Sequence, residues 1–324
     1  MTTIAQWDDC IEQWYRNSMA LTGPIAPFSS MKALSSEYLP EPYYGDYQNC
    51  LVPVININPG RCCANEDSKN WNYRNNPKGS WNKCSTPGPG QLLYDFEHNH
   101  NYKYFEWQKV YSPFVNRSVP GSKDWWEPYR NEYINRVIEL YQAAKNSTDV
   151  KPLPEKGPGN NVFHGITPFA LELCPLHSKT TRGLNFKFKG LKNTYIDNVI
   201  EPACESLKYS KIPFGLGFGR KVYDALLASG RFVECKRWQN GWEYDNAGKP
   251  TKEITVWPKK NGKRINRTYA LVEWNENAEI GLNDHHPYFL VTWHQGSFIK
   301  ITHTVMVNFA AVDEYIVRQI AQII

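Results

Sequence analysis

The sequence predicts an α/β protein, built as a three-layer α/β/α sandwich around a central, mostly parallel sheet. Short apolar runs at 51–57, 169–174 and 288–293 each end in a polar turn, as strands buried on both faces do. Apolar residues at helical spacing occur between and around these runs, at 3–20, 124–145, 193–209 and 312–323. For 324 residues we expect a single domain, 1–324, with insertions at about 61–121 and 231–267.

The helix at 124–145 has the clearest signal. Asp124 can cap it, and Pro128 suits its first turn. Its apolar stripe is formed by Tyr133, Ile134, Val137, Ile138 and Tyr141. We expect this helix to cover one face of the sheet.

The segment 179–192, which alternates basic residues with Phe186 and Phe188, predicts a strand with one basic face, suited to phosphates or simply solvated.

The first apolar run leads directly into Asn58-Pro59-Gly60. Ligands of open α/β sheets bind beyond the carboxyl ends of the strands, so Asn58 stands where chemistry is expected. Pro59 is rigid and Gly60 is permissive, and together they predict a sharp turn. The alternative is that Asn58 only hydrogen-bonds its own turn.

A charged residue, Glu172, interrupts the second apolar run. A buried carboxylate must be paired or must serve a ligand. A carboxylate only accepts hydrogen bonds, so a ligand held by Glu172 must present a donor. The alternative is a salt bridge with Lys179 or Arg182.

The third run ends in Trp293-His294-Gln295-Gly296-Ser297, which places a histidine at another strand end. Between the second and third runs, residues 212–227 predict a strand, a glycine turn and a helix. These glycines do not fit Gly-x-Gly-x-x-Gly, so nucleotide binding is rejected. No Gly-x-Ser-x-Gly is present, which argues against an α/β hydrolase with a nucleophile elbow.

Residues 231–267 are strongly basic, and Asn240-Gly241 and Asn261-Gly262 predict hairpin turns flanked by tryptophans. A basic hairpin with aromatic rings suits contact with a DNA backbone, and a merely decorated surface is the alternative. The net charge of +5 is compatible with a polyanion without requiring one. Twelve Trp and twenty Tyr offer stacking surfaces for bases, although core packing also uses such rings.

The residues 57–60 resemble the first active-site motif of the uracil-DNA glycosylase superfamily. In its mismatch-specific thymine/uracil branch a strand ends in Gly-Ile-Asn-Pro-Gly, and here Asn56 takes the place of the leading glycine. Glu172 stands where relatives place a base-reading residue, commonly Asn, and His177-Ser178 resembles the turn that follows. The natural donor on a pyrimidine edge is the cytosine amino group, whereas uracil and thymine present an oxygen there, so a base read by Glu172 would be of cytosine type. His294 to Ser297 matches the His of the third motif, His-Pro-Ser-Pro, but lacks its prolines. The glycine turn lies between the second and third motifs, as in the family.

The resemblance implies a uracil-DNA glycosylase-like fold and a role for each matched position. Asn58 would orient the attacking water and His294 would stabilise the departing base. The base would be held by Asn56, Glu172, His177, Ser178 and a stacking ring, for which Trp71 and Trp107 are candidates, as are Tyr73 and Trp81. DNA contacts are expected from Lys179, Arg182, Lys187, Lys259, Lys260, Arg264 and Ser297. No metal or organic cofactor is implied.

We therefore expect a monofunctional DNA glycosylase that acts on a flipped-out base. The carboxylate of Glu172 and the long segment after Asn58 favour a bulky, modified cytosine, as in some phage genomes, and the chain resembles bacterial defence glycosylases. One alternative within the class is repair of uracil or mismatched thymine. Another, from a different class, is a non-catalytic nucleic-acid-binding protein with the same fold.

The remaining expectations concern partners and compartment. DNA is the expected partner, and we expect a monomer with no membrane contact, because no apolar run approaches membrane-spanning length. The first residues lack the pattern of a signal peptide, so a cytoplasmic location is expected, in a bacterium or phage. The eight cysteines are then expected to be reduced thiols. Cys50, Cys62, Cys63 and Cys84 do not match the spacing of the iron-sulfur cluster found in some relatives.

Overall fold

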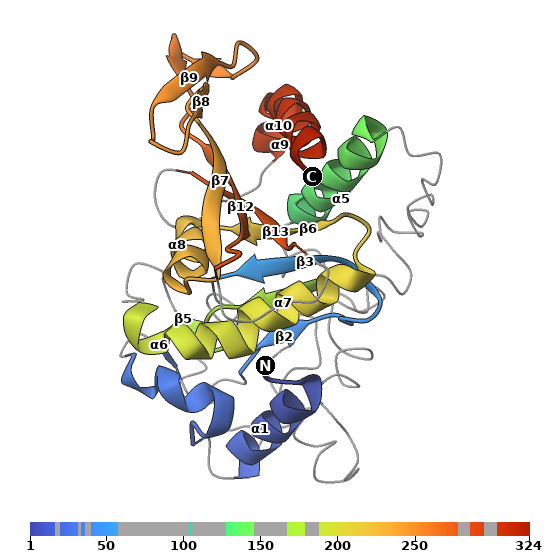
Figure 1. Ribbon diagram of the computed structural model, residues 1–324. Coiled ribbons are helices and arrows are strands. Elements are labelled where there is room, and N and C mark those ends of the chain that lie inside the picture. The colour runs from blue at the N-terminus through green and yellow to red at the C-terminus, as the bar shows by residue number, and fades with distance from the viewer. Residues whose placement is uncertain are drawn as a thin grey trace.

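The computed structural model describes residues 1–16, 20–31, 34–35, 40–57, 104, 128–145, 167–178, 188–277, 286–294 and 303–324. These residues form a mixed α/β fold, in which one large sheet has helices on both faces (Figure 1). The helices and strands named below are those of the described residues.

The large sheet has a parallel centre and antiparallel flanks. Its strand order is β2-β4-β3-β6-β13-β12-β7-β8-β9. Each neighbouring pair is parallel among the four central strands, which are β4 (Thr167–Glu172), β3 (Cys50–Asn56), β6 (Phe214–Phe218) and β13 (Tyr288–Trp293). The antiparallel flanks are β2 (Tyr43–Tyr44) on one side and, on the other, β12 (Thr268–Trp274), β7 (Phe232–Gln239), β8 (Trp242–Tyr244) and β9 (Pro250–Glu253). The sheet is therefore mixed, where the sequence predicted a mostly parallel one.

Two short antiparallel pairs accompany the large sheet. β1 (Leu34–Ser35) pairs with β5 (His177–Ser178), and β10 (Lys259–Lys260) pairs with β11 (Lys263–Arg264). Both predicted hairpin turns are confirmed. Asn240-Gly241 joins β7 to β8 and Asn261-Gly262 joins β10 to β11, and all four residues have positive φ, as this tight turn requires.

Three helices cover one face of the sheet. They are α5 (Pro128–Ala144), α9 (His303–Asn308) and α10 (Ala310–Ile323). The predicted stripe of α5 is buried here against residues of β3, β6 and β12, including Val54, Leu216 and Leu271. This apolar burial is the main term that holds the helix in place, because its isolated helical propensity is modest.

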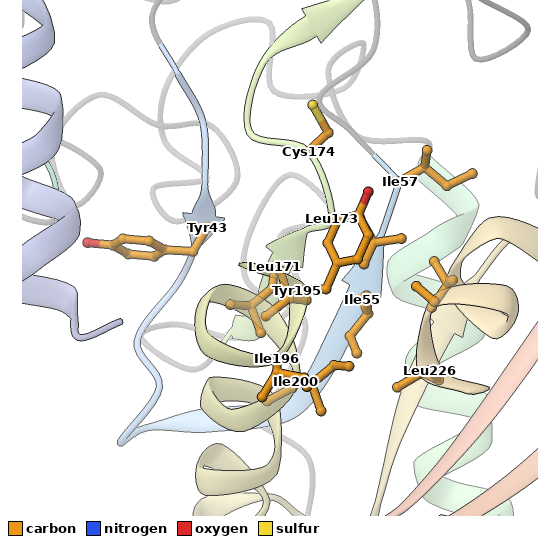
Figure 2. Close-up of a cluster of buried hydrophobic side chains, with 14 of the residues drawn as sticks. Tyr43, Ile55, Ile57, Leu171, Leu173, Cys174, Tyr195, Ile196, Ile200 and Leu226 are labelled. Carbon is orange, nitrogen blue, oxygen red and sulfur yellow. The ribbon is translucent and has the colours of Figure 1, made fainter. Parts of the chain in front are cut away.

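The other face is covered by α1 (Ile4–Arg16), the 3-10 helix η1 (Gly23–Ser30), a continuous helical segment and α8 (Arg220–Ala228). The continuous segment comprises α6 (Phe188–Tyr195), the π-helical turn η5 (Ile196–Ile200), α7 (Glu201–Ser206) and the 3-10 turn η6 (Leu207–Tyr209). Figure 2 shows Ile196 and Ile200 of this segment beside Ile55 of β3 and Leu171 of β4. The core thus lies in two layers, one on each side of the sheet.

Two glycines of β6 let α8 and β13 approach closely. A Cβ on Gly215 would lie 2.2 Å from the Phe289 ring, and one on Gly217 would lie 2.9 Å from Val222 of α8. Neither contact is compatible with a side chain at these positions. The glycines that fail the nucleotide-binding pattern therefore have a packing role.

Most predicted elements are confirmed, with shifted ends. The helix predicted at 3–20 is α1, which ends at Arg16, and the strands at 51–57 and 169–174 are β3 and β4. The strand predicted at 179–192 is wrong for its last five residues, because α6 begins at Phe188 and buries Leu191 and Tyr195 on one face. Residues 179–187, and Asp124 as a cap of α5, lie outside the described residues.

Candidate functional site

The four parallel strands bring their carboxyl ends to one edge of the sheet. Asn56, the last residue of β3, pairs in register with Glu172, the last residue of β4. On the other side, Phe218 at the end of β6 pairs with Thr292 of β13, so His294 follows two residues later at the same edge. Adjacent strands lie about 4.8 Å apart, so the ends of β3 and β13, two strands away, are separated by roughly 10 Å.

Asn56 and Glu172 form a buried hydrogen-bonded pair at this edge. The Asn56 Nδ2 donates to Glu172 Oε1 over 3.2 Å, and each residue is 4% exposed. Strand alternation places both side chains on the face that carries Val54 and Ala170, which is the face covered by α5. The amide gives the carboxylate a donor, which offsets part of the cost of removing its charge from water.

The backbone beyond the pair is held by further hydrogen bonds. Leu173 N donates to Asn56 O and Cys174 N donates to Ile57 O, each over 3.0 Å, so the parallel pairing continues past both strand ends. Glu172 N donates to Pro42 O over 3.0 Å on the other side. The Glu172 backbone is therefore fixed between β3 and the chain that enters β2.

A second buried carboxyl, Glu41, lies at the same edge. Its N–H donates to Pro175 O over 2.8 Å, and its side chain accepts a hydrogen bond from the Tyr44 hydroxyl. Burial raises the pKa of the Glu41 carboxyl to about 8, although the Tyr44 hydrogen bond lowers it. Glu41 is therefore largely protonated at neutral pH. The sequence analysis did not identify it, and its one signal is a charge set between two prolines just before β2.

Tyr104 is the one described residue of the long segment after β3. Its ring packs edge-on against Tyr43, with centroids 5.5 Å apart, and its hydroxyl donates to Tyr43 O over 3.5 Å. Burial raises its pKa well above the ordinary value, and nearby carboxyls raise it further. Tyr104 thus packs against β2, the strand beside β4.

His294 is exposed and follows a strand end that is firmly held. Gly219 N, at the start of α8, donates to Thr292 O over 2.9 Å. The Trp293 ring packs against Tyr223 of α8, with centroids 5.0 Å apart. The last residues of β13 are thus fixed to α8 while the imidazole remains open to solvent.

A buried guanidinium, Arg267, lies beside the end of β13. It immediately precedes Thr268, which pairs with Trp293, and its Nε donates to Thr292 Oγ1 over 3.3 Å. The guanidinium is surrounded by the rings of Tyr269, Phe309 and Tyr133, at 4.7, 4.7 and 5.7 Å from the ring centroids.

Asp313 of α10 balances the charge of Arg267. Burial alone would lower the pKa of Arg267, but Tyr269, Asp313 and Tyr133 raise it, so Arg267 stays charged. Asp313 accepts a hydrogen bond from the Tyr269 hydroxyl over 2.7 Å and lies 3.7 Å from Arg136 of α5. This network joins β12, β13, α5 and α10, and no pattern in the sequence indicated it.

The basic residues predicted to contact DNA fall into two groups. Lys259 and Lys260 are exposed on β10. Arg264 on β11 is engaged within the protein, because its guanidinium pairs with Glu253 and stacks 5.3 Å from the Trp242 ring centroid. Lys259 and Lys260 are thus the solvent-facing candidates of this hairpin.

The structure places the backbone of His177 and Ser178 in β5, where they pair with Ser35 and Leu34. These residues lie five and six positions after Glu172 in a separate two-stranded ladder. The other predicted site residues lie outside the described part of the chain: Asn58, Trp71, Trp107, Lys179, Arg182, Lys187 and Ser297. The structure therefore does not describe the alternative partners of Glu172 in a salt bridge, Lys179 and Arg182.

A cavity of about 320 Å³ lies away from this edge. It is on the opposite face of the sheet, between α1, β2, β4 and α7, and is lined by Trp7, Tyr43, Phe169 and Leu171 among others. Asn56 and Glu172 face the α5 side, so this cavity is not part of the candidate site.

Among the described residues, the cysteines supply no activated thiol to this edge and no metal-binding cluster is found. Cys10, Cys50, Cys174, Cys204 and Cys235 are free thiols, and burial raises the pKa of each. A raised thiol pKa disfavours the reactive thiolate. Within the described ranges, no three His, Cys, Asp or Glu side chains gather as metal ligands, and no helix there combines the length and apolar character needed to cross a bilayer.

Comparisons with protein-family models, with curated proteins and with solved structures find no match for this chain.

Proposed function

We propose that this protein is a monofunctional DNA glycosylase with a uracil-DNA glycosylase-like fold. The observation that carries the proposal is the edge of the parallel centre, where β3, β4 and β13 end in the chain order of the three motifs. That edge holds an amide and a carboxylate in direct contact and an exposed imidazole on a fixed strand end. The imidazole has the chemistry to stabilise a departing base, and the amide–carboxylate pair has the chemistry to hold one.

The target nucleotide is extruded from the helix, because its glycosidic bond cannot be reached in the stack. Asn58 orients the water that attacks the sugar C1′; as a neutral amide it positions the water and does not act as a strong base. His294 donates to O2 of the departing base and stabilises the negative charge that develops there. The mechanism uses no lysine nucleophile.

Glu172 reads the base. A carboxylate acceptor fits the exocyclic amino group of a cytosine-type base and opposes the O4 oxygen of uracil or thymine. The hydrogen bond from Asn56 holds the carboxylate in one orientation, which a glycine at this position could not do. The preferred substrate is a cytosine with a bulky 5-substituent, as in modified phage DNA, and the biological role is defence.

The test is an activity panel with matched duplexes. Each duplex carries one target, which is uracil, thymine opposite guanine, cytosine, or cytosine with a bulky 5-substituent, and abasic sites are scored by alkaline strand cleavage. We expect abasic product from the modified cytosine, and loss of product in Asn58→Ala. Product from uracil alone would remove the substrate assignment, and no product from any duplex of the panel would leave a non-catalytic DNA-binding protein.

A second variant tests the reading of the base. Glu172→Gln presents an amide in place of the carboxylate, and we expect its kcat/KM on modified cytosine relative to uracil to fall at least about 100-fold. Glu41→Gln is the matched control, because Glu41 is a buried carboxyl at the same edge that is already largely neutral. Equal discrimination in the two variants would contradict the role of Glu172.

A further inference from the structure

The basic hairpins form an arm, residues 240–267, that begins and ends at the same edge as the candidate site. β7 ends at Gln239, which pairs with Thr268, and Thr268 in turn pairs with Trp293 next to His294. Ile254 and Trp257 anchor the arm in the core beside α9 and α10. Figure 1 shows β8 and β9 (orange) projecting from the body of the sheet.

The positive charge of the protein is concentrated in and beside this arm. The chain has 37 basic and 32 acidic side chains, and residues 231–267 hold ten of the basic and four of the acidic ones. The remainder therefore has 27 basic and 28 acidic side chains, which is close to neutral. A surface that carries the whole positive excess is the expected contact for a polyanion.

The two faces of β8 differ in chemistry. On the inner face Glu243 is buried, pairs with Lys236 over 3.2 Å and accepts a hydrogen bond from Tyr315 of α10. On the outer face Trp242 and Tyr244 are only half-buried and lie two residues apart on the same side of the strand.

Each outer ring carries a guanidinium. Arg264 stacks on Trp242 at 5.3 Å and Arg237 stacks on Tyr244 at 5.2 Å, measured from Cζ to the ring centroid. The outer face therefore presents two neighbouring pairs of an aromatic ring and a cation.

We propose that the outer face of the arm binds unpaired nucleotides of a DNA strand. Contact with a duplex backbone needs only phosphate ligands such as Lys259 and Lys260, whereas partly exposed rings beside cations are a surface on which unpaired bases stack. The arm thus holds single-stranded DNA beside the site edge. The identity of the polyanion as DNA rests on the proposed function.

The test measures binding of a labelled oligothymidylate strand, and of a duplex of equal length, over a range of salt concentrations. Trp242→Ala and Tyr244→Ala should each weaken binding of the single strand at least about fivefold, because one stacked base contributes about 1–3 kcal/mol. The slope of log affinity against log salt should stay unchanged, since no phosphate contact is lost. Lys259→Ala with Lys260→Ala should instead lower that slope, by about 0.7 per lost phosphate contact for single strands.

Tyr315→Ala is the matched control, because it removes a ring that carries a cation, Lys252, on the inner side. It should leave single-strand affinity unchanged. Ring variants that bind the single strand like the wild type, or that lose single-strand and duplex affinity equally, would overturn the proposal, as would a wild-type protein that does not bind the strand. Oligothymidylate holds no cytosine-type base, so its binding is measured independently of base excision. Strand binding together with no abasic product on the duplex panel would refute the proposed activity and leave the arm assignment standing.

Discussion

The two ends of the sheet's carboxyl edge bury ionisable groups in opposite ways. At the β3–β4 end, the partners that the structure describes are neutral donors, because Glu172 accepts from the Asn56 amide and Glu41 accepts from the Tyr44 hydroxyl. At the β12–β13 end, the charge of Arg267 is met by the carboxylate of Asp313 and by ring faces. Neutral donors can be supplied by a ligand such as a base, whereas a charge pair in the core fixes the strands around it. The first end is suited to recognition and the second to support.

Removing the guanidinium at the supporting end should have the largest effect. Arg267→Met leaves Asp313 buried without its main counter-charge, and we expect the free energy of unfolding to fall by about 3–5 kcal/mol. Urea denaturation measures this change. The matched control is Arg264→Met on the partly exposed arm, which should cost about 1 kcal/mol or less.

A second substitution distinguishes charge from packing at Arg267. Adding Asp313→Asn to Arg267→Met removes the buried carboxylate that has lost its main counter-charge, so part of the lost stability should return. If the single variant is as stable as the wild type, the network is not what holds β12 and β13 to the helices.

His294 follows the end of β13 that the Arg267 network contacts, and its imidazole should affect the catalytic rate but not the stability of the fold. Under the proposed mechanism, His294→Ala should lower kcat about 100- to 1,000-fold, as removal of one donor to a developing anion does. The unfolding free energy should not change, because His294 is exposed. His286→Ala, an exposed histidine just before the start of β13, is the control and should keep full activity. A rate equal to wild type in His294→Ala would remove His294 from the mechanism.

At the β3–β4 end, the neutral state of Glu41 predicts a pH dependence of stability. Its folded pKa of about 8 lies above the ordinary value of 4.5, so above pH 4.5 the unfolded chain releases a proton that the folded protein keeps. Stability is therefore lost as pH rises from about 4.5 to about 8. Glu41→Gln removes this loss, and at pH 8 it should unfold with a free energy roughly 4 kcal/mol above wild type.

The comparison of the two proteins across pH gives the check. Thermal or urea unfolding at pH 5 should find them similar, and the gap should open toward pH 8. A constant difference between the variant and the wild type would mean that Glu41 does not take up a proton on folding.

Local sequence signals located most of the fold. The β-branched run before Asn56 predicted β3, the stripe from Tyr133 to Tyr141 predicted α5, and each Asn-Gly pair predicted its hairpin. These signals work because they depend on neighbours in the chain. β12 was not predicted, although it lies inside the large sheet between β13 and β7.

For the candidate site, the sequence by itself determined that the Asn56 amide, the Glu172 carboxylate and the His294 imidazole lie at or just after the ends of apolar strands. Only the tertiary structure decided that the β4 and β13 ends flank β3 and β6, that Asn56 is the hydrogen-bond partner of Glu172, and that Glu41 and Arg267 lie buried at this edge. The physical reason is the separation of the interacting residues along the sequence. Strand-end turns are set by adjacent residues, whereas partners such as Asn56 and Glu172 are 116 residues apart, and packing selects them only when the whole sheet has formed.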